Sequence, residues 1–343
     1  MSNINHDPAT DQDLPQILKI ATKNRLEGER IDLAGMLDDF KPNVAARVRS
    51  CDTYIRLEVH EHKETHEKMR SLVFANYCKV RKFCPQCASK YAREVAADFI
   101  GRYVAMQRKR KLDHLSSYRL LFLTLTVKNC PLDQLREKLR EMSRGWQRFI
   151  NTKRFKQAVA GGWFRGVEYL GDHTPPGEAH PHFHAILIVT KSYFDDDYIK
   201  ADEWSQMWRQ ALRADYDPVV HVEVIKKRLR QVVGDGGKVV ERVQSAIDAA
   251  VAEVCKYSVA PTAVMQLSKA DFRVLYEQTL QGRQFALGGL VKDTPPDPPE
   301  QLDPDLWTYL GIEIWQWGQG QYVMTHEYHA RQPETASAGD SKE

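Results

Sequence analysis

The sequence has no long apolar run and no large excess of charge of either sign. No stretch approaches the roughly 20 apolar residues that a membrane-spanning helix needs. The N-terminal residues MSNINHDPATDQD also lack the apolar core of a secretory signal. These absences indicate a cytoplasmic protein without a membrane partner. In that reducing compartment we expect the six cysteines to be thiols or metal ligands rather than disulfides.

The net charge is too small to identify a binding partner. The chain has 49 Lys and Arg residues and 46 Asp and Glu residues, which leaves +3 at pH 7. Electrostatics of the whole chain therefore neither require nor exclude nucleic acid. Basic side chains are concentrated in residues 102–111 and 138–156. Such clusters can neutralise phosphates, although solvated helix faces show the same pattern.

No internal repeat divides the 343 residues, and composition predicts four segments. Residues 1–50 form an N-terminal extension that is partly helical and partly disordered. Residues 51–111 contain four of the six cysteines and end in a basic helix. Residues 112–293 are the most regular part of the chain. Residues 294–343 combine a proline-rich linker, a short aromatic segment and a disordered tail.

Strand and helix signals alternate within the regular part. Apolar and β-branched runs predict strands at 120–127, 163–170, 180–189 and 219–225. Apolar residues at three- and four-residue spacing predict helices after Pro131, around 204–212 and at about 243–257, the last one after a glycine-rich loop at 234–237. This order predicts an α+β fold, with a central antiparallel or mixed β-sheet flanked by helices.

Three histidines alternate with apolar residues in one predicted strand. The two-residue period places His180, His182 and His184 on the same face. The segment Thr-Pro-Pro-Gly lies in the loop before this strand and predicts a reversal centred on residue 175. Such a reversal sets Glu168 opposite His182, because the two residues are equally far from residue 175 in the sequence. Directly paired residues share a face of the sheet. Two imidazoles and a carboxylate would then converge on one divalent metal.

Mixed imidazole and carboxylate ligands do not identify that metal. They are compatible with Mn²⁺, Mg²⁺, Zn²⁺, Co²⁺ and Ni²⁺. The alternative is a set of buried histidines with a purely structural role. For phosphodiester chemistry at open coordination positions, Mg²⁺ or Mn²⁺ is the expected ion.

A glutamate and a tyrosine lie four residues apart in the last predicted helix. Glu253 and Tyr257 therefore share one helical face. Small residues near that face would let the helix approach a sheet or a substrate closely. Taken alone the pair indicates little, since most pairs at this spacing lie on the surface.

Cysteines form a second candidate metal site. Cys78, Cys84 and Cys87 follow the pattern C-x5-C-x2-C, and Cys51 upstream would complete a four-thiolate zinc site. In the alternative reading Cys51 is an ordinary core residue, and the fourth ligand is His60, His62 or His66. A third reading has no metal in this segment.

Three motifs resemble, in order, those of the plasmid rolling-circle replication initiators. They are FLTLT (122–126), HPHFHAILIV (180–189) and EVCKYSV (253–259). These initiators belong to the HUH endonucleases, named for histidine–hydrophobic–histidine. The chain resembles the branch with a glutamate four residues before the nucleophilic tyrosine. The resemblance covers roughly residues 51–290 and includes the family's closing segment, here LQGRQFALGGLVKD (280–293).

The resemblance implies the HUH endonuclease fold with Mg²⁺ or Mn²⁺ at the nicking site. His182 and His184 would be metal ligands and Glu168 the third, while His180 is additional to the two-histidine core of the family. The family often has a similar cysteine set ahead of its catalytic domain, which implies an N-terminal zinc-binding segment.

The resemblance also implies the chemistry. Tyr257 would attack origin DNA, leaving a 5′-phosphotyrosine and a free 3′-hydroxyl for a polymerase. Glu253 would be a general base that activates water to end the round, unless strand transfer ends it. Many relatives have a lysine three residues after the tyrosine, where this chain has Ala260. Lys256 is the candidate replacement for that charge.

The expected partners are origin DNA, as a single-stranded nick site with flanking duplex, and a host helicase and polymerase. One alternative function is a zinc-dependent hydrolase that activates water without a covalent intermediate. Another is a non-catalytic, zinc-containing DNA-binding repressor with structural histidines. The upstream cysteines and the Glu/Tyr spacing favour an initiator over a related tyrosine transposase.

Overall fold

The protein is described by a computed structural model in which two compact units are present. One unit contains Met1–Gly28, Ala46–Cys78 and Pro299–Glu343, and the other contains Glu29–Ala45 and Lys79–Pro298. None of the described helices combines the length and the apolar character needed to cross a bilayer. The structure describes residues 20–171, 174–225, 228–233, 239–244, 246–255, 263–264, 266–298 and 301–330.

The smaller unit contains a four-stranded antiparallel sheet in the order β13-β12-β1-β2. Its strands are β1 (Tyr54–His62), β2 (Lys68–Ala75), β12 (Trp307–Gly318) and β13 (Gln321–His329). The aromatic segment near the end of the sequence is therefore a strand, and Trp315 of β12 pairs with Ile55 of β1. These two residues belong to the core of this sheet, with Leu57, Trp317 and Tyr322.

The larger unit is built on a five-stranded sheet in the order β11-β5-β7-β3-β8. Every neighbouring pair in it is antiparallel, so the predicted α+β class is confirmed and the sheet is antiparallel rather than mixed. The strands are β3 (Arg119–Thr126), β5 (Gly162–Glu168), β7 (His182–Val189), β8 (Val220–Val224) and β11 (Phe285–Gly288). The strands expected at 120–127, 163–170, 180–189 and 219–225 are all present within a few residues.

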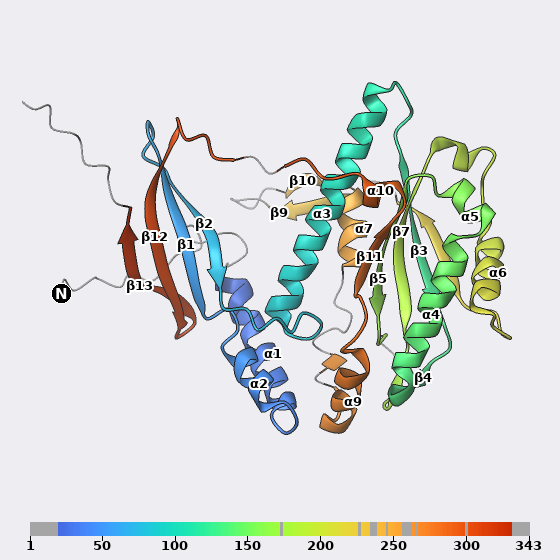
Figure 1. Cartoon of the computed structure of the whole chain (residues 1–343), viewed down its shortest axis with the longest axis horizontal. Coiled ribbons are helices and arrows are strands. Elements are labelled where there is room, and N and C mark those ends of the chain that lie inside the picture. Colours follow the sequence, from blue (N-terminus) through green and yellow to red (C-terminus); the bar gives the residue numbers. More distant parts are fainter. Residues whose placement is uncertain are drawn as a thin grey trace, which may run out of the picture. The chain divides into compact units, whose positions relative to one another are not determined.

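Helices cover both faces of this sheet. Figure 1 shows α3 (Pro85–Leu112) and α7 (Ala246–Val254) on one side, and α4 (Leu135–Ile150), α5 (Lys153–Ala158) and α6 (Ala201–Leu212) on the other. The described residues also form the helices α1 (Ile20–Leu37), α2 (Pro42–Arg49), α9 (Lys269–Thr279) and α10 (Leu290–Asp293). Short strands β4 (Cys130–Pro131) and β6 (Glu178–Ala179) pair with each other.

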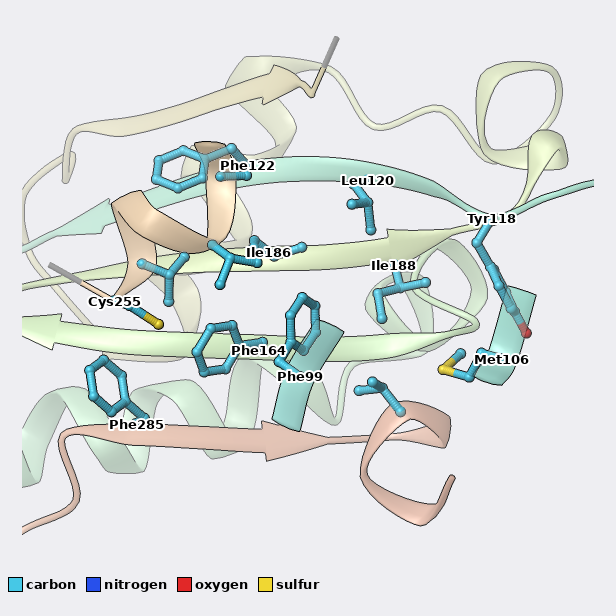
Figure 2. Packing of buried hydrophobic residues seen from close by; sticks show 14 residues of the cluster. Phe99, Met106, Tyr118, Leu120, Phe122, Phe164, Ile186, Ile188, Cys255 and Phe285 are labelled. Atoms are coloured by element: carbon cyan, nitrogen blue, oxygen red, sulfur yellow. The ribbon is translucent and has the colours of Figure 1, made fainter. Parts of the chain in front are cut away.

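The face under α3 and α7 carries a cluster of buried apolar side chains, which Figure 2 shows. Phe122, Ile186 and Phe164 come from three adjacent strands and point to this face, because they are directly paired across β3, β7 and β5. Phe99 of α3 stacks on Phe164 with ring centroids 4.7 Å apart. Burial of these aromatic side chains stabilises the packing of α3 on the sheet.

The opposite face packs on α4 and α6. Trp146 and Phe149 of α4 are fully buried there, as the three- and four-residue spacing of apolar side chains predicted. Trp146 meets Phe183 of β7 edge to face at 5.9 Å. A 3-10 turn at Leu132–Gln134 separates Pro131 from the helix, which begins at Leu135 rather than at the proline.

The segment before α7 contains two strands that the sequence did not predict. Residues Arg228–Val233 form β9 and Val239–Gln244 form β10, and the two pair antiparallel. The predicted glycine-rich loop at 234–237 lies outside the described residues. Helix α7 begins at Ala246, three residues later than expected. The expected disordered tail lies largely outside the described residues, from position 331 onward.

Candidate metal centre

The centre begins with the pairing of β5 and β7. Glu168 lies directly opposite His182, and Gly166 lies opposite His184. The register predicted from a turn centred on residue 175 is therefore confirmed. Paired residues point to the same face of a sheet, so the carboxylate and both imidazoles lie at one end of the face that α7 covers.

Three ligand atoms from this face form a nearly equilateral triangle. His182 Nε2 lies 3.1 Å from Glu168 Oε2 and 3.1 Å from His184 Nε2. The third side, from His184 Nε2 to Glu168 Oε2, measures 3.2 Å. These residues form one of two groups in the described chain that could hold a metal ion.

The size of the triangle fits a divalent cation. With metal–ligand bonds of about 2.1 Å, adjacent donors stand about 3.0 Å apart in an octahedron and about 3.4 Å apart in a tetrahedron. Two of the observed sides are closer to the octahedral value, and the third lies midway between the two values. Three donors on one face of an octahedron would leave positions open for water or substrate oxygens.

Contacts outside the triangle hold both rings in a suitable orientation. His182 Nδ1 donates to the carbonyl oxygen of His180 at 2.9 Å, and His184 Nδ1 lies 3.2 Å from Thr124 Oγ1 on β3. When Nδ1 carries the proton, Nε2 keeps a lone pair for a metal. Metal-binding histidines in proteins usually have outer partners of this kind.

The carboxylate of the triangle stays ionised at neutral pH. Burial alone would raise the pKa of Glu168, but hydrogen bonds with His182 and His184, and the charges of those rings, outweigh burial and lower the pKa to about 2. Burial alone would lower the pKa of His182, yet its partner Glu168 and the more distant Glu253 raise it. A carboxylate held ionised between two imidazoles is a favourable setting for a divalent ion.

Glu253 of α7 faces the same region. It lines a cavity of about 620 Å³ together with His184, Thr124 and His221. Nothing in the sequence distinguished His221 from other histidines. Tyr257, Lys256 and Ala260 lie outside the described residues.

A glycine in β5 allows α7 to come this close. A Cβ atom added at Gly166 would lie 2.4 Å from the backbone oxygen of Val254, at the end of α7. Real atoms cannot approach so closely, so the helix could not keep its place beside an alanine. Gly166 was not among the residues predicted to build the site, although a glycine inside a strand run is a known sign of close backbone approach.

His180 lies near the triangle but does not join it. Its ring centroid is 5.4 Å from that of His182, and its Nδ1 is hydrogen-bonded to Asn129 Oδ1 at 2.6 Å. The structure thus brings together three of the four predicted ligands at this centre.

The four cysteines form the second group that could hold a metal. Cys51, Cys78, Cys84 and Cys87 are all buried, and their sulfur atoms lie within 4.8 Å of one another. The backbone N–H of Cys78 points to Cys51 Sγ at 3.4 Å. None of these four described cysteines forms a disulfide. Four converging sulfur atoms are the donor set of a structural zinc site.

Known proteins similar to this chain are replication proteins. Residues 69–328 match the profile of a family described as "Replication protein". A "Protein rep" from Bacillus amyloliquefaciens is 33% identical over 227 residues, which cover 64% of this chain and 63% of that protein. The chain thus spans slightly less than two thirds of that relative.

Two further relatives match longer parts of the chain. A "Protein rep" from Streptococcus pneumoniae serotype 2 is 29% identical over 262 residues, or 74% of this chain and 72% of the relative. A "Protein rep" from Lentilactobacillus hilgardii is 28% identical over 291 residues, or 81% and 85%. No solved structure matches the chain significantly.

Proposed function

The chain belongs to the replication protein family, and we propose on this basis that it starts rolling-circle replication by nicking one strand of a plasmid origin. The observation that supports this chemistry most is the triangle of Glu168, His182 and His184 at one end of the β-sheet. Glu253 on α7 lines a cavity with His184. Its position agrees with a reaction in which the end of α7 supplies the nucleophile.

The proposed nick is a transfer of the phosphodiester to Tyr257. A Mg²⁺ or Mn²⁺ ion bound by the triangle would polarise a non-bridging phosphate oxygen and offset negative charge. The phenol oxygen of Tyr257 forms a bond to phosphorus and gives up its proton. The bond from phosphorus to the 3′-oxygen breaks, and that oxygen takes a proton. The products are a 5′-phosphotyrosine and a 3′-hydroxyl for the polymerase.

Glu253 is proposed to act when the round ends. Its carboxylate accepts a proton from water, and the water oxygen bonds to phosphorus as the bond to the Tyr257 oxygen breaks. The phenol regains a proton, and the strand ends in a 5′-phosphate. In strand transfer, a 3′-hydroxyl takes the place of water and a closed circle is released.

The cysteine group is proposed to hold a structural Zn²⁺. The partners follow from replication itself: the single-stranded nick site and its flanking duplex, then a host helicase and polymerase. The finer assignment to the HUH endonucleases is part of this proposal and rests on the resemblance of the three motifs.

The test is the formation of a protein–DNA adduct. The full-length protein is incubated with Mn²⁺ and a labelled oligonucleotide from its plasmid's origin, and then run on a denaturing gel. We expect a labelled band at protein mass, lost in Tyr257→Phe and kept in Tyr198→Phe, a control at an exposed tyrosine.

The two alternative functions, a hydrolase and a repressor, predict different results on the same gel. Cleavage without any protein-linked strand would contradict the tyrosine mechanism and favour a metal-dependent hydrolase. Specific binding without cleavage, unchanged in His182→Ala, would favour a repressor.

A further inference from the structure

A cavity of about 530 Å³ opens on the face of β5 opposite the metal centre. Side chains alternate along a strand, so Arg165 and Val167 point into this cavity while Glu168 points to the metal centre. In the described part of the chain no acidic side chain lines the cavity. Its lining includes five arginines, here called the arginine groove: Arg136, Arg140, Arg144, Arg165 and Arg283.

A second cavity extends the groove along β5 and β11. It measures about 460 Å³ and shares Arg165 and Arg283 with the first one. Lys292 also lines it, close to one acid, Asp293. The two cavities together form an elongated basic surface rather than a pocket for one small ion.

Arg165 at the base of the groove is largely buried and incompletely satisfied. Its guanidinium carbon lies 4.0 Å from the ring centre of Phe183 and 5.4 Å from that of Trp146. Its Nε atom has no hydrogen-bond partner among the described residues. Burial lowers the pKa of this arginine to about 10. A buried cation of this kind is stabilised when an anion binds beside it.

Two arginines of α4, Arg140 and Arg144, share one exposed partner. Arg140 and Arg144 both contact Glu137, at 3.5 and 2.8 Å, and all three side chains are more than half exposed. Ion pairs that are this exposed contribute little to stability, so both side chains can turn to a phosphate instead. Arg136, Arg140 and Arg144 recur every four residues, which puts them about 6 Å apart along one side of the helix.

We propose that the arginine groove binds the sugar–phosphate backbone of the single-stranded DNA that flanks the nick. The site depends on the proposed nicking function only for the identity of its ligand. Arginines spaced along a helix suit successive phosphates of an extended strand. Glu168 is the last residue of β5, so a DNA strand at the metal centre reaches the groove by passing the end of that strand.

The experiment measures binding of a labelled single-stranded oligonucleotide by fluorescence anisotropy, with the full-length protein and no added divalent metal. The groove variant is Arg140→Ala/Arg144→Ala/Arg283→Ala, which leaves the buried Arg165 in place. We expect its Kd to rise at least about tenfold, and its salt dependence, as the slope of log Kd against log salt, to fall by about 2.

The matched control removes three other exposed arginines with ion pairs: Arg108→Ala/Arg209→Ala/Arg273→Ala. Their side chains are 62, 44 and 60% exposed, against 57 and 59% for Arg140 and Arg144. The net charge changes equally in both variants. The control should therefore change Kd by less than about threefold, since only general electrostatics are weakened.

Three results would overturn the proposal. The groove variant and the control could bind single strands equally well. The groove variant could keep its affinity for single strands and lose affinity only for duplex DNA. The groove variant could lose affinity for a free deoxynucleoside triphosphate and keep its affinity for the oligonucleotide, which would identify a nucleotide site.

The covalent adduct separates this proposal from the nicking function. At saturating DNA the groove variant should still form the protein-linked strand with Mn²⁺. If no variant forms the adduct but the groove variant still binds single strands weakly, the nicking proposal fails and the groove stands. If adduct formation is normal and binding is unchanged, the groove proposal fails alone.

Discussion

Glu168 is the residue on which the metal centre depends. It contributes the only negative charge of the triangle, and its Oε2 atom contacts both ring nitrogens. Its place opposite His182 could be predicted because a hairpin turn and a two-residue period fix which side chains face each other. The choice between an ion and a purely structural cluster could not be made from that pattern, since it depends on distances of a few tenths of an ångström.

Replacing this carboxylate should remove metal binding without unfolding the sheet. We expect Glu168→Gln to weaken Mn²⁺ binding at least about tenfold, because the amide keeps the shape but not the charge. Isothermal titration calorimetry measures the change. Glu223→Gln, at an acid that lines the neighbouring cavity, should bind Mn²⁺ like the parent protein, and equal losses in both variants would argue against Glu168 as a ligand.

Gly166 should tolerate no side chain. Because an added Cβ would meet the backbone of Val254 at 2.4 Å, Gly166→Ala should displace the end of α7 and destabilise the protein by about 1–3 kcal/mol. Urea unfolding gives the free energy, and nicking assays should show a larger loss than stability explains. Gly318→Ala is the control, since nothing lies within 4 Å of its added Cβ; similar behaviour of the two variants would contradict the account.

Two elements, β5 and α7, decide how the site is built. β5 presents Glu168 on one face and Arg165 on the other, and its apolar run made it predictable as a strand. α7 was predicted to begin at 243, but residues 239–244 belong to β10. The sequence RLRQVVGDGGKVVERVQ does contain the signal that was overlooked: β-branched runs on both sides of a glycine-rich turn indicate a hairpin. Charged residues in both runs obscured the alternation.

On α7, Glu253 should matter for one step only. Glu253→Gln should preserve nicking and strand joining but slow hydrolysis of the adduct by at least about a hundredfold, which is a typical contribution of a general base. Time courses that follow adduct and free 5′-phosphate separate these steps. Asp248→Asn, at an acid in the first turn of the same helix, should leave all steps unchanged. A uniform loss of nicking, joining and hydrolysis in Glu253→Gln would contradict its role as base.

At the scale of the whole molecule, the chain combines two compact units made from interleaved segments. Composition suggested consecutive segments, and the sheet of the smaller unit could not be predicted because β1 and β12 lie more than 240 residues apart in the sequence, as in the pair Tyr54 and Gln316. Such pairing depends on side-chain fit and not on local pattern. The cysteine set, by contrast, was predictable from spacing, because Cys78, Cys84 and Cys87 are close together in the sequence and cysteine is the residue that binds zinc as a thiolate.

Zinc is expected to stabilise the folded chain. Cys84→Ser should lower the zinc content well below the one ion per chain expected for the parent protein. It should also reduce the melting temperature, because a bound structural ion favours the folded state. Elemental analysis and calorimetry give the two values. Cys130→Ser alters a buried cysteine outside the group and should keep the ion. Full zinc content in Cys84→Ser would refute the proposed ligand set.

Tyr257 is expected to become linked to DNA at the metal centre. The most direct measurement is mass spectrometry of peptides from the Mn²⁺-dependent adduct after nuclease digestion. We expect a nucleotide joined through phosphate to the peptide that contains Tyr257, and no such peptide from Glu168→Gln. A nucleotide on any other residue, or cleaved DNA without a modified peptide, would contradict it.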